Sequence, residues 1–352
     1  MMLAAKVYGK NDLRVEEVPI PEVPKDSILV KVHACSICGT DLRIYRRGDY
    51  RAEYPVITGH EIAGEVVEVS EGITSVKVGD RVNVAPGHGC GHCKMCKIGQ
   101  PNVCETPHPS MGYKLNGGFA QYIAVPEHIF RLGFVNKIPD NLSYEQASIA
   151  EIIACCLNAQ LNAPVVKGDT VLIMGAGPAG IIHAYLSRMN GAEKIIVTQR
   201  SKGRLIQLEE KFPELVDVTI SSEEQDLFES VKNETDGFGP DVIYVCAPSR
   251  EAQEQALKMV RSRGRVNFFG GLPKDDCVVR LNANDLHYRE FFVSGASSSL
   301  PETNRKALEL LSNKDIDPDK IITHVLPLSE IEEGFRLMEE KKSIKVVIKP
   351  WE

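Results

Sequence analysis

Alternating hydrophobic and polar residues mark the first 140 positions of the chain as β-rich. Residues 27–37, 63–69 and 119–125 alternate with the period of two that is typical of half-buried strands. Glycine and proline residues stand between these runs, as turn residues do. Because no crossover helices are expected between the strands, the pattern predicts a compact, antiparallel, barrel-like domain.

An apolar pattern with the period of a helix follows at residues 143–163. Ser143, with Gln146 three residues later, forms a capping box that marks its start. Glu151 stands in the middle of this pattern among isoleucine, alanine and cysteine residues. A carboxylate in such a setting needs a partner, and a metal ion or a hydroxyl-rich substrate would be one. The alternative is a solvated helix face, which the apolar neighbours disfavour.

Residues 170–174 form an apolar run typical of a buried strand, and a glycine-rich turn follows at once. A helix at 181–190 and a second strand at 194–198 complete a unit whose glycines let a pyrophosphate approach a helix N-terminus. Three further apolar runs between residues 241 and 296 alternate with helices and predict a doubly wound parallel sheet. The turn residues predicted to bind the coenzyme are Gly175, Gly177, Pro178, Ala179 and Gly180.

The end of the second strand bears on the choice of coenzyme. NAD-binding proteins place Asp or Glu there, about 20 residues past the loop, to hold the ribose 2′-hydroxyl. This chain has Gln199 at that position, with Arg200 and Lys202 close behind. The missing carboxylate removes repulsion of a 2′-phosphate, and Arg200 can meet that phosphate with a fork of donors. We therefore expect NADP(H), with NAD(H) as the alternative because Gln199 can also hydrogen-bond a bare ribose.

The last segment of the chain returns to a mixture of helices and strands that we expect to rejoin the first domain. The expected elements are helices at 302–312 and 328–341 and strands at 321–326 and 344–348. The predicted divisions are a catalytic domain over 1–155 with a cysteine-rich lobe at about 86–110, a nucleotide-binding domain over 156–296, and a C-terminal return over 297–352.

Four of the ten cysteines crowd one loop of the first domain. Their spacing is C-x₂-C-x₂-C-x₇-C, and four thiolates so spaced can close tetrahedrally around one structural Zn²⁺. A ferredoxin-like cluster is the competing use, but the Cys-Pro that ends the usual ferredoxin run is absent. The four residues are Cys90, Cys93, Cys96 and Cys104. Four other cysteines lie in apolar runs and are expected to be buried, namely Cys35, Cys156, Cys246 and Cys277.

Two short upstream segments hold a second set of metal-ligand types. Cys38 begins Cys38-Gly39-Thr40-Asp41, and Gly59 is followed by His60 and Glu61. A thiolate, an imidazole and a carboxylate are the ligands of an open zinc site that keeps a position for water or substrate. Taken alone, these residues would be interpreted as a buried thiol and an ordinary histidine. The surrounding motifs favour a catalytic metal.

The net charge of −7 over 352 residues argues against a nucleic-acid or anionic-membrane partner. The N-terminal residues lack the basic end and the apolar run of a signal peptide. No run reaches the roughly 18 apolar residues that a membrane span needs. We therefore expect a cytoplasmic protein that acts on a small molecule.

In this order, the motifs resemble those of the zinc-containing medium-chain alcohol dehydrogenase family (the medium-chain dehydrogenase/reductases), and specifically its sorbitol (polyol) and threonine dehydrogenase branch. The resemblance extends over nearly the whole chain and includes Ala147-Ser148-x-x-Glu151. It implies a GroES-like catalytic domain, a Rossmann coenzyme domain, and one catalytic and one structural zinc ion. We also expect a homodimer or homotetramer, since closed oligomers are the general rule.

The resemblance implies a role for each residue of the catalytic metal set. Cys38 and His60 match the fixed zinc ligands. Glu61 matches a carboxylate that in relatives binds the metal directly or through conformational exchange. Glu151 matches the helix acid of the polyol branch, a ligand directly or through water, and Cys155 is the runner-up ligand one turn later.

The resemblance also implies how protons and ring orientation are handled. Thr40 occupies the hydroxyl position that contacts the substrate oxygen and begins the proton relay, and Asp41 matches the partner that orients His60. Relatives commonly have histidine three residues after Thr40, where this chain has Arg43. Arg43 therefore either binds an anionic substrate or the coenzyme, or leaves the relay to end in water or the coenzyme ribose. The chain also has Glu151-Ile152-Ile153 where the polyol pattern usually has Glu-Pro-Leu.

The leading hypothesis is a zinc-dependent oxidoreductase that transfers hydride between NADP(H) and a secondary hydroxyl of a polyol, sugar derivative or small alcohol. The nearest alternative is an NAD-linked threonine or simple secondary-alcohol dehydrogenase. From other classes we weigh a redox-inert zinc- and nicotinamide-binding sensor and a metal-free enone or quinone reductase. The acidic charge disfavours a nucleic-acid-binding sensor, and the intact ligand set disfavours both.

Overall fold

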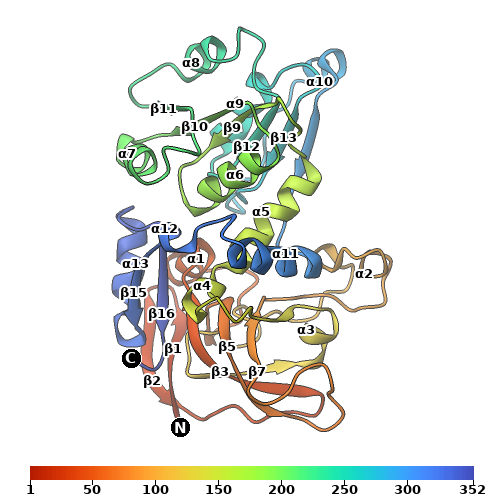
Figure 1. The fold of residues 1–352 in the computed structure, drawn as a ribbon, viewed down its shortest axis with the longest axis vertical. Helices are drawn as coiled ribbons and strands as arrows, with labels where there is room; N and C mark the ends of the chain where they lie inside the picture. The colour runs from red at the N-terminus through yellow and green to blue at the C-terminus, as the bar shows by residue number, and fades with distance from the viewer. The chain divides into compact units, whose positions relative to one another are not determined.

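The computed structural model describes residues 1–352 as two compact units (Figure 1). Unit 1 comprises Met1–Ala154 and Ser299–Glu352, and unit 2 comprises Cys155–Ser298. The C-terminal segment thus belongs to the same unit as the N-terminal one. None of the helices has the length and apolar character to cross a lipid bilayer.

Unit 1 is built on a seven-stranded sheet in the order β15-β16-β3-β5-β6-β8, with β7 pairing β3. All neighbours are antiparallel except β15 and β16. A three-stranded sheet in the order β2-β1-β4 completes the β-rich part. The strands are β1 Met2–Gly9, β2 Asp12–Val18, β3 Ser27–Ser36, β4 Val56–Ile57, β5 Glu61–Val69, β6 Arg81–Val84, β7 Tyr122–Pro126, β8 Val135–Lys137, β15 Ile322–Pro327 and β16 Lys345–Lys349.

Short helices lie between these strands. The capping box at Ser143 and Gln146 is present, with the Ser143 Oγ accepting from the Gln146 N–H at 3.1 Å. The single helix expected at 143–163 is instead two helices that meet at Ile149. The helices of unit 1 are α1 Gly39–Arg47, α2 Lys94–Lys97, η1 Pro101–Val103, α3 Glu127–Arg131, α4 Tyr144–Ser148, α11 Pro301–Ser312, α12 Pro318–Ile321, η2 Leu328–Glu330 and α13 Ile331–Glu339, and α5 Ala150–Asn162 begins there.

The C-terminal segment pairs with the first sheet. β16 pairs antiparallel with β3, and Val347 stands opposite Ser36. This pairing brings residues from the end of the chain to the strand that precedes Cys38. The helix expected at 328–341 is a 3₁₀ turn, η2, followed by α13.

Unit 2 is a parallel six-stranded sheet in the order β11-β10-β9-β12-β13-β14. The order reverses between β9 and β12, which is the topological switch point where Rossmann sheets bind dinucleotides. Its strands are β9 Thr170–Met174, β10 Lys194–Gln199, β11 Val218–Ser221, β12 Val242–Val245, β13 Arg265–Phe268 and β14 Phe292–Gly295. Its further helices are α6 Pro178–Met189, α7 Lys202–Lys211, α8 Leu227–Asn233, α9 Arg250–Met259 and α10 Ala283–Arg289.

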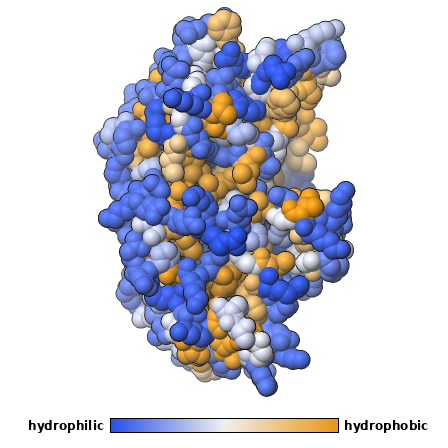
Figure 2. Space-filling model, turned by 45° about the vertical axis from the view of Figure 1, so that its right-hand side comes forward, coloured by the Kyte–Doolittle hydropathy of each residue, from blue (hydrophilic) through white to orange (hydrophobic).

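Each unit has its own apolar core, and hydrophilic residues cover much of the face in Figure 2, with hydrophobic residues between them. Two of the cysteines expected in these cores, Cys35 and Cys156, are buried. Cys246 is half-buried, and the expectation was wrong for Cys277, which is exposed, as is the neighbouring Val278. An apolar neighbour in sequence did not mean an apolar environment there.

Candidate metal and coenzyme sites

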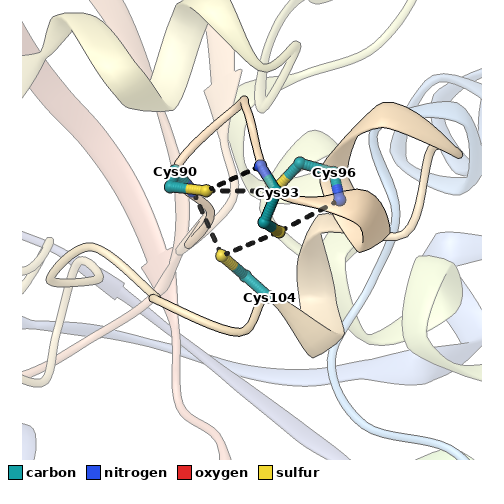
Figure 3. Close-up of side chains that lie close together, drawn as sticks. All are labelled: Cys90, Cys93, Cys96 and Cys104. Carbon is teal, nitrogen blue, oxygen red and sulfur yellow. Dashed lines mark hydrogen bonds between the residues drawn. The ribbon is translucent and has the colours of Figure 1, made fainter.

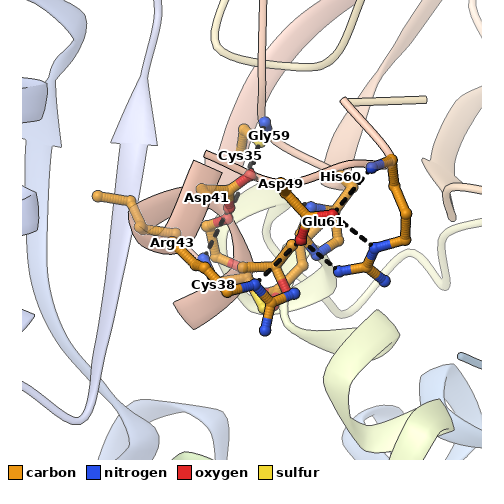
Figure 4. Close-up of polar contacts among 12 residues, drawn as sticks. Cys35, Cys38, Asp41, Arg43, Asp49, Gly59, His60 and Glu61 are labelled. Carbon is orange, nitrogen blue, oxygen red and sulfur yellow. Dashed lines mark hydrogen bonds and ion pairs between the residues drawn. The ribbon is translucent and has the colours of Figure 1, made fainter. Parts of the chain in front are cut away.

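Cys38, His60 and Glu61 come together because β3 and β5 pair as antiparallel neighbours. Ser36, the last residue of β3, stands opposite Glu61, the first residue of β5. Cys38 is the N-cap of α1 just beyond β3, and His60 immediately precedes β5. One potential ligand atom from each of the three lies within 4.8 Å of the others (Figure 4). A thiolate, an imidazole and a carboxylate so placed fit a zinc ion.

Asp41 holds two of these residues in place from the first turn of α1. Its carboxylate accepts hydrogen bonds from the backbone N–H groups of Cys38 (2.9 Å) and Gly59 (3.0 Å), and its Oδ1 lies 3.3 Å from Nδ1 of His60. Burial raises the pKa of Asp41, but the His60 charge and these hydrogen bonds outweigh burial and leave the pKa below its ordinary value. An ionised carboxylate facing Nδ1 leaves Nε2 of His60 available to a metal.

Glu61 is fully buried, and both of its carboxylate oxygens are bound. Oε1 lies 2.6 Å from Nζ of Lys345, and Oε2 accepts a hydrogen bond from Oγ of Ser36. Lys345, on β16, also donates to the Ile37 carbonyl at 3.0 Å. Burial lowers the pKa of Lys345, but the charge of Glu61 more than compensates and raises it above its ordinary value. The pair is therefore a buried carboxylate and a buried ammonium.

Glu151 lies near this group without belonging to it. Its side chain, near the start of α5, is buried rather than on a solvated face. Burial raises the pKa of Tyr113, and the charge of Glu151 adds to this effect. The ring of Tyr113 lies 5.4 Å from the ring of His60. The structure thus gathers Cys38, His60 and Glu61 directly and brings Glu151 to their vicinity.

Thr40 and Arg43 lie on α1, just beyond Cys38. The NH2 group of Arg43 is 3.5 Å from Oγ1 of Thr40, and its Nε donates to Oδ2 of Asp49 at 3.0 Å (Figure 4). Arg51 binds the same carboxylate with Nε at 3.0 Å and NH2 at 2.8 Å. Burial raises the pKa of Asp49, but the bonds from Arg51 and the charge of Arg43 lower it to about 2. Asp49 is therefore an anion between two cations.

The four clustered cysteines converge as the spacing predicts (Figure 3). The sulfur atoms of Cys90 and Cys96 are 4.0 Å apart, and those of Cys93 and Cys104 are 3.7 Å apart. Four Zn–S bonds of about 2.3 Å in a tetrahedron would put the sulfur atoms about 3.8 Å apart, so the cluster fits one zinc ion. A hydrogen bond with the Thr106 side chain and others from backbone N–H groups lower the pKa of Cys90 to about 5, which favours the thiolate.

The glycine-rich turn has the backbone that a pyrophosphate site requires. Gly175 has a φ of +124°, and a Cβ on Gly180 would lie 1.9 Å from the Gly175 carbonyl oxygen. Gly177 is the N-cap of α6 and Pro178 is its first residue, and no side chain caps the N–H groups of the first turn. Gln199 accepts a hydrogen bond from the Ala176 N–H at 3.0 Å and so fixes this turn to the end of β10.

The two cations predicted to read a 2′-phosphate are exposed and already paired. Arg200 contacts Glu223 at 3.1 Å, and Lys202 contacts Glu224 at 3.2 Å. Both glutamates lie just beyond β11, the neighbour of β10. A phosphate would have to compete with these carboxylates for the two cations.

Arg204 is a further cation at the coenzyme turn that the sequence motifs did not indicate. Its NH1 lies 2.8 Å from the point that a Cβ on Gly177 would occupy, so the guanidinium rests on the glycine-rich turn. Its Nε is buried with no hydrogen-bond partner, and burial lowers the pKa of the group. In the sequence, Arg204 follows shortly after the second strand of the coenzyme-binding unit, and this position could have indicated a role in coenzyme binding.

Comparison with known proteins agrees with this geometry. Residues 24–139 match the alcohol dehydrogenase GroES-like domain, and residues 178–313 match the zinc-binding dehydrogenase family. The chain is 33% identical to a Bacillus subtilis sorbitol dehydrogenase over 99% of its own length and 97% of that protein. It is 36% identical to a Pyrococcus furiosus L-threonine 3-dehydrogenase over 99% of its length and 98% of that protein.

The chain belongs to the zinc-containing medium-chain alcohol dehydrogenase family. Family membership makes it an oxidoreductase of CH–OH donors, with the GroES-like and Rossmann folds that the sequence predicts. A crystal structure from Sinorhizobium meliloti, described as a zinc-binding dehydrogenase bound to NADP, superimposes with a TM-score of 0.90 at 29% identity and covers 99% of both chains. The family is thus established from both sequence and fold.

Proposed function

We propose that this dehydrogenase uses zinc and NADP(H) to oxidise a secondary hydroxyl of a polyol, a sugar derivative or a similar small alcohol. The observation that carries the proposal is the grouping of Cys38, His60 and Glu61, with the helix acid Glu151 nearby. In this proposal unit 1 is the catalytic domain and unit 2 is the coenzyme domain. The four-cysteine cluster holds a structural zinc ion.

Cys38 and His60 are the two fixed ligands in this account, because Asp41 holds both of them. The two backbone hydrogen bonds to Asp41 fix the segments that carry the ligands, and its contact with Nδ1 directs Nε2 of His60 toward the metal. Zinc bound there would act as a Lewis acid that lowers the pKa of a substrate hydroxyl. Thr40, two residues after Cys38, would accept the proton of that hydroxyl and pass its own hydroxyl proton on to water or to the coenzyme ribose.

The two glutamates have different parts in this account. Glu61 is already bound by Lys345 and Ser36, so it supplies negative charge behind the metal and can approach it only by weakening those bonds. Glu151 is a buried residue near Cys38, His60 and Glu61, and in this account it completes the metal shell directly or through water.

The coenzyme preference rests on three residues around the glycine-rich turn. Gln199 brings no negative charge to the ribose position, so the residue at the end of β10 does not repel a 2′-phosphate. Arg204 lies on the turn with an unpartnered Nε, and Arg200 is exposed at the end of β10. We infer that these two guanidinium groups bind the coenzyme phosphates and that Arg200 exchanges Glu223 for the 2′-phosphate.

A homo-oligomer formed through the edge strand β14 is the proposed assembly. β14 ends the parallel sheet, so one side of its backbone is unpaired. Phe292 and Val293 on this strand are exposed, and Tyr288 just before it is exposed as well. Light scattering on a Val293→Lys variant tests the assembly: a smaller mass than the native protein is expected, and an unchanged mass would contradict this interface.

The experiment that tests the function is nicotinamide reduction by the zinc-loaded protein with a crossed set of substrates. Sorbitol, a simple secondary alcohol and L-threonine are each assayed with NAD⁺ and with NADP⁺. Among these combinations, we expect the highest kcat/KM with sorbitol and NADP⁺. Turnover only of threonine or the simple alcohol with NAD⁺ would favour the alternative dehydrogenase. Zinc binding without turnover of any alcohol would favour the redox-inert sensor.

A further inference from the structure

Arg43 and Arg51 form a cationic pair around Asp49 beside the proposed catalytic metal. We propose that this pair binds an anionic group, a carboxylate or a phosphate, that the substrate carries in addition to its reacting hydroxyl. The inference deepens the proposed function and rests on it: the substrate class becomes an acidic polyol, such as a sugar acid or a polyol phosphate.

The contacts connect the pair to the reacting position on two sides. On one side Arg43 reaches the hydroxyl of Thr40 at 3.5 Å. On the other side the guanidinium of Arg51 lies over the ring of Tyr113 at 5.1 Å, and that ring is 5.4 Å from His60. The cations thus border the same residues to which the proposal assigns proton transfer and metal binding.

The charge of the cluster does not balance internally. Asp49 has a side chain that is only 4% exposed, and both of its neighbours hold it ionised. One carboxylate between two guanidinium groups leaves one unit of positive charge. Arg43 and Arg51 have 37% and 42% of their side chains exposed, so this excess charge is accessible rather than buried in the core.

The unused donors also suit an anion. Each guanidinium has five N–H groups in a planar fork, and the contacts with Asp49 and Thr40 occupy only part of them. Planar forks of this kind match the oxygen atoms of a carboxylate or a phosphate bidentately. A neutral polyol needs hydrogen bonds but no net charge. Asp49 fixes the two forks in place before the substrate arrives, which reduces the entropy lost on binding.

The test compares matched substrates with the zinc-loaded full chain. Sorbitol is the neutral substrate, gluconate carries a carboxylate and sorbitol 6-phosphate carries a phosphate, so the two acids distinguish the source of the charge. Charge-assisted hydrogen bonds contribute enough that Arg43→Gln should lower the acidic-to-neutral ratio of kcat/KM about tenfold to hundredfold. Arg43→Lys should recover part of it. Asp49→Asn removes the negative charge that competes with the substrate anion but keeps an oxygen atom that can accept from the two guanidinium groups, so it should raise the ratio.

The control variant is Arg46→Gln on the same helix, because Arg46 pairs with Glu339 away from this cluster. Its acidic-to-neutral ratio should equal that of the native protein. If Arg43→Gln instead lowers kcat/KM equally for neutral and acidic substrates and raises the KM of the coenzyme, Arg43 contacts the coenzyme and the proposal is overturned.

A binding measurement separates this proposal from the catalytic one. Calorimetric titration with inorganic phosphate and with acetate requires no turnover. Tighter binding of either anion to the native protein than to Arg43→Gln supports the anion site even if no alcohol is oxidised. Equal binding to both proteins overturns the anion site, and turnover of sorbitol in the same preparation would leave the dehydrogenase function standing.

Discussion

The buried pair of Lys345 and Glu61 gives the sharpest stability prediction. Replacement of Lys345 by methionine leaves a fully buried carboxylate without its cation, and breaking such a pair costs about 3–5 kcal/mol. For a unit of this size we expect the melting temperature to fall by roughly 6–20 °C. The control is Lys349→Met on the same strand, whose ion pairs are at the surface and should contribute less than about 1 kcal/mol.

A double-mutant cycle isolates the ion pair from packing. Glu61→Gln alone should also destabilise the protein, because it leaves the Lys345 ammonium unpaired. The combined variant Lys345→Met with Glu61→Gln should be less destabilised than the sum of the two single changes by about 2 kcal/mol. Denaturant unfolding followed by circular dichroism measures the three values. Additive losses would refute the reasoning, since they would mean that the two charges do not stabilise each other.

Three further predictions follow from other parts of the molecule. His183 on α6 is fully buried with both ring nitrogens unpartnered, and burial lowers its pKa to about 3. The unfolded chain binds a proton at His183 near pH 6.5, whereas the folded chain does not. The contribution of neutral His183 to the free energy of unfolding is therefore complete above pH 6.5 and is lost as the pH falls toward 3. Between pH 8 and pH 5 this contribution falls by about 2 kcal/mol. The free energy of unfolding of His183→Phe, measured at both pH values, should lack this decrease. If the free energy of unfolding changes equally with pH in the native protein and the variant, the assignment to His183 is contradicted. Cys93→Ala should remove one zinc equivalent and lower the melting temperature without changing the zinc bound near Cys38, as metal analysis can check; unchanged zinc content would exclude the cysteine cluster as a zinc site. Gln199→Asp should raise the KM for NADP⁺ at least tenfold more than that for NAD⁺, because the new carboxylate would repel the 2′-phosphate that only NADP⁺ carries, and an equal effect on both coenzymes would speak against a 2′-phosphate at this position.

Local patterns predicted many of the strands and the order of the two domains, but they did not mark β1, β2, β4, β6, β8 or β11. The strand expected at residues 27–37 is β3, and the strand expected at 194–198 is β10. These elements are predictable because their side chains alternate or are uniformly buried over a few consecutive positions. The break at Ile149 was not predictable, because both helices on either side of it continue the same apolar composition.

Contacts between distant segments could not be predicted from those patterns. Lys345 meets Glu61 across 284 positions of sequence, and only the pairing of β16 with β3 brings them together. The pairing of Arg200 with Glu223 likewise follows from β10 and β11 being neighbours. The sequence identified the residue types that could bind a metal or a phosphate. The partners that compete for them depend on sheet order and register, which a single sequence does not contain.

The most direct test of the central claim is the dependence of alcohol oxidation on the zinc bound near Cys38 and His60. The rate of NADP⁺ reduction with sorbitol or its acidic analogues is measured for the native protein and for His60→Ala, each with its zinc content determined. The account predicts two zinc ions per native chain, one per variant chain, and activity only in the native protein. Full activity of a folded His60→Ala protein that holds one zinc ion would contradict the account.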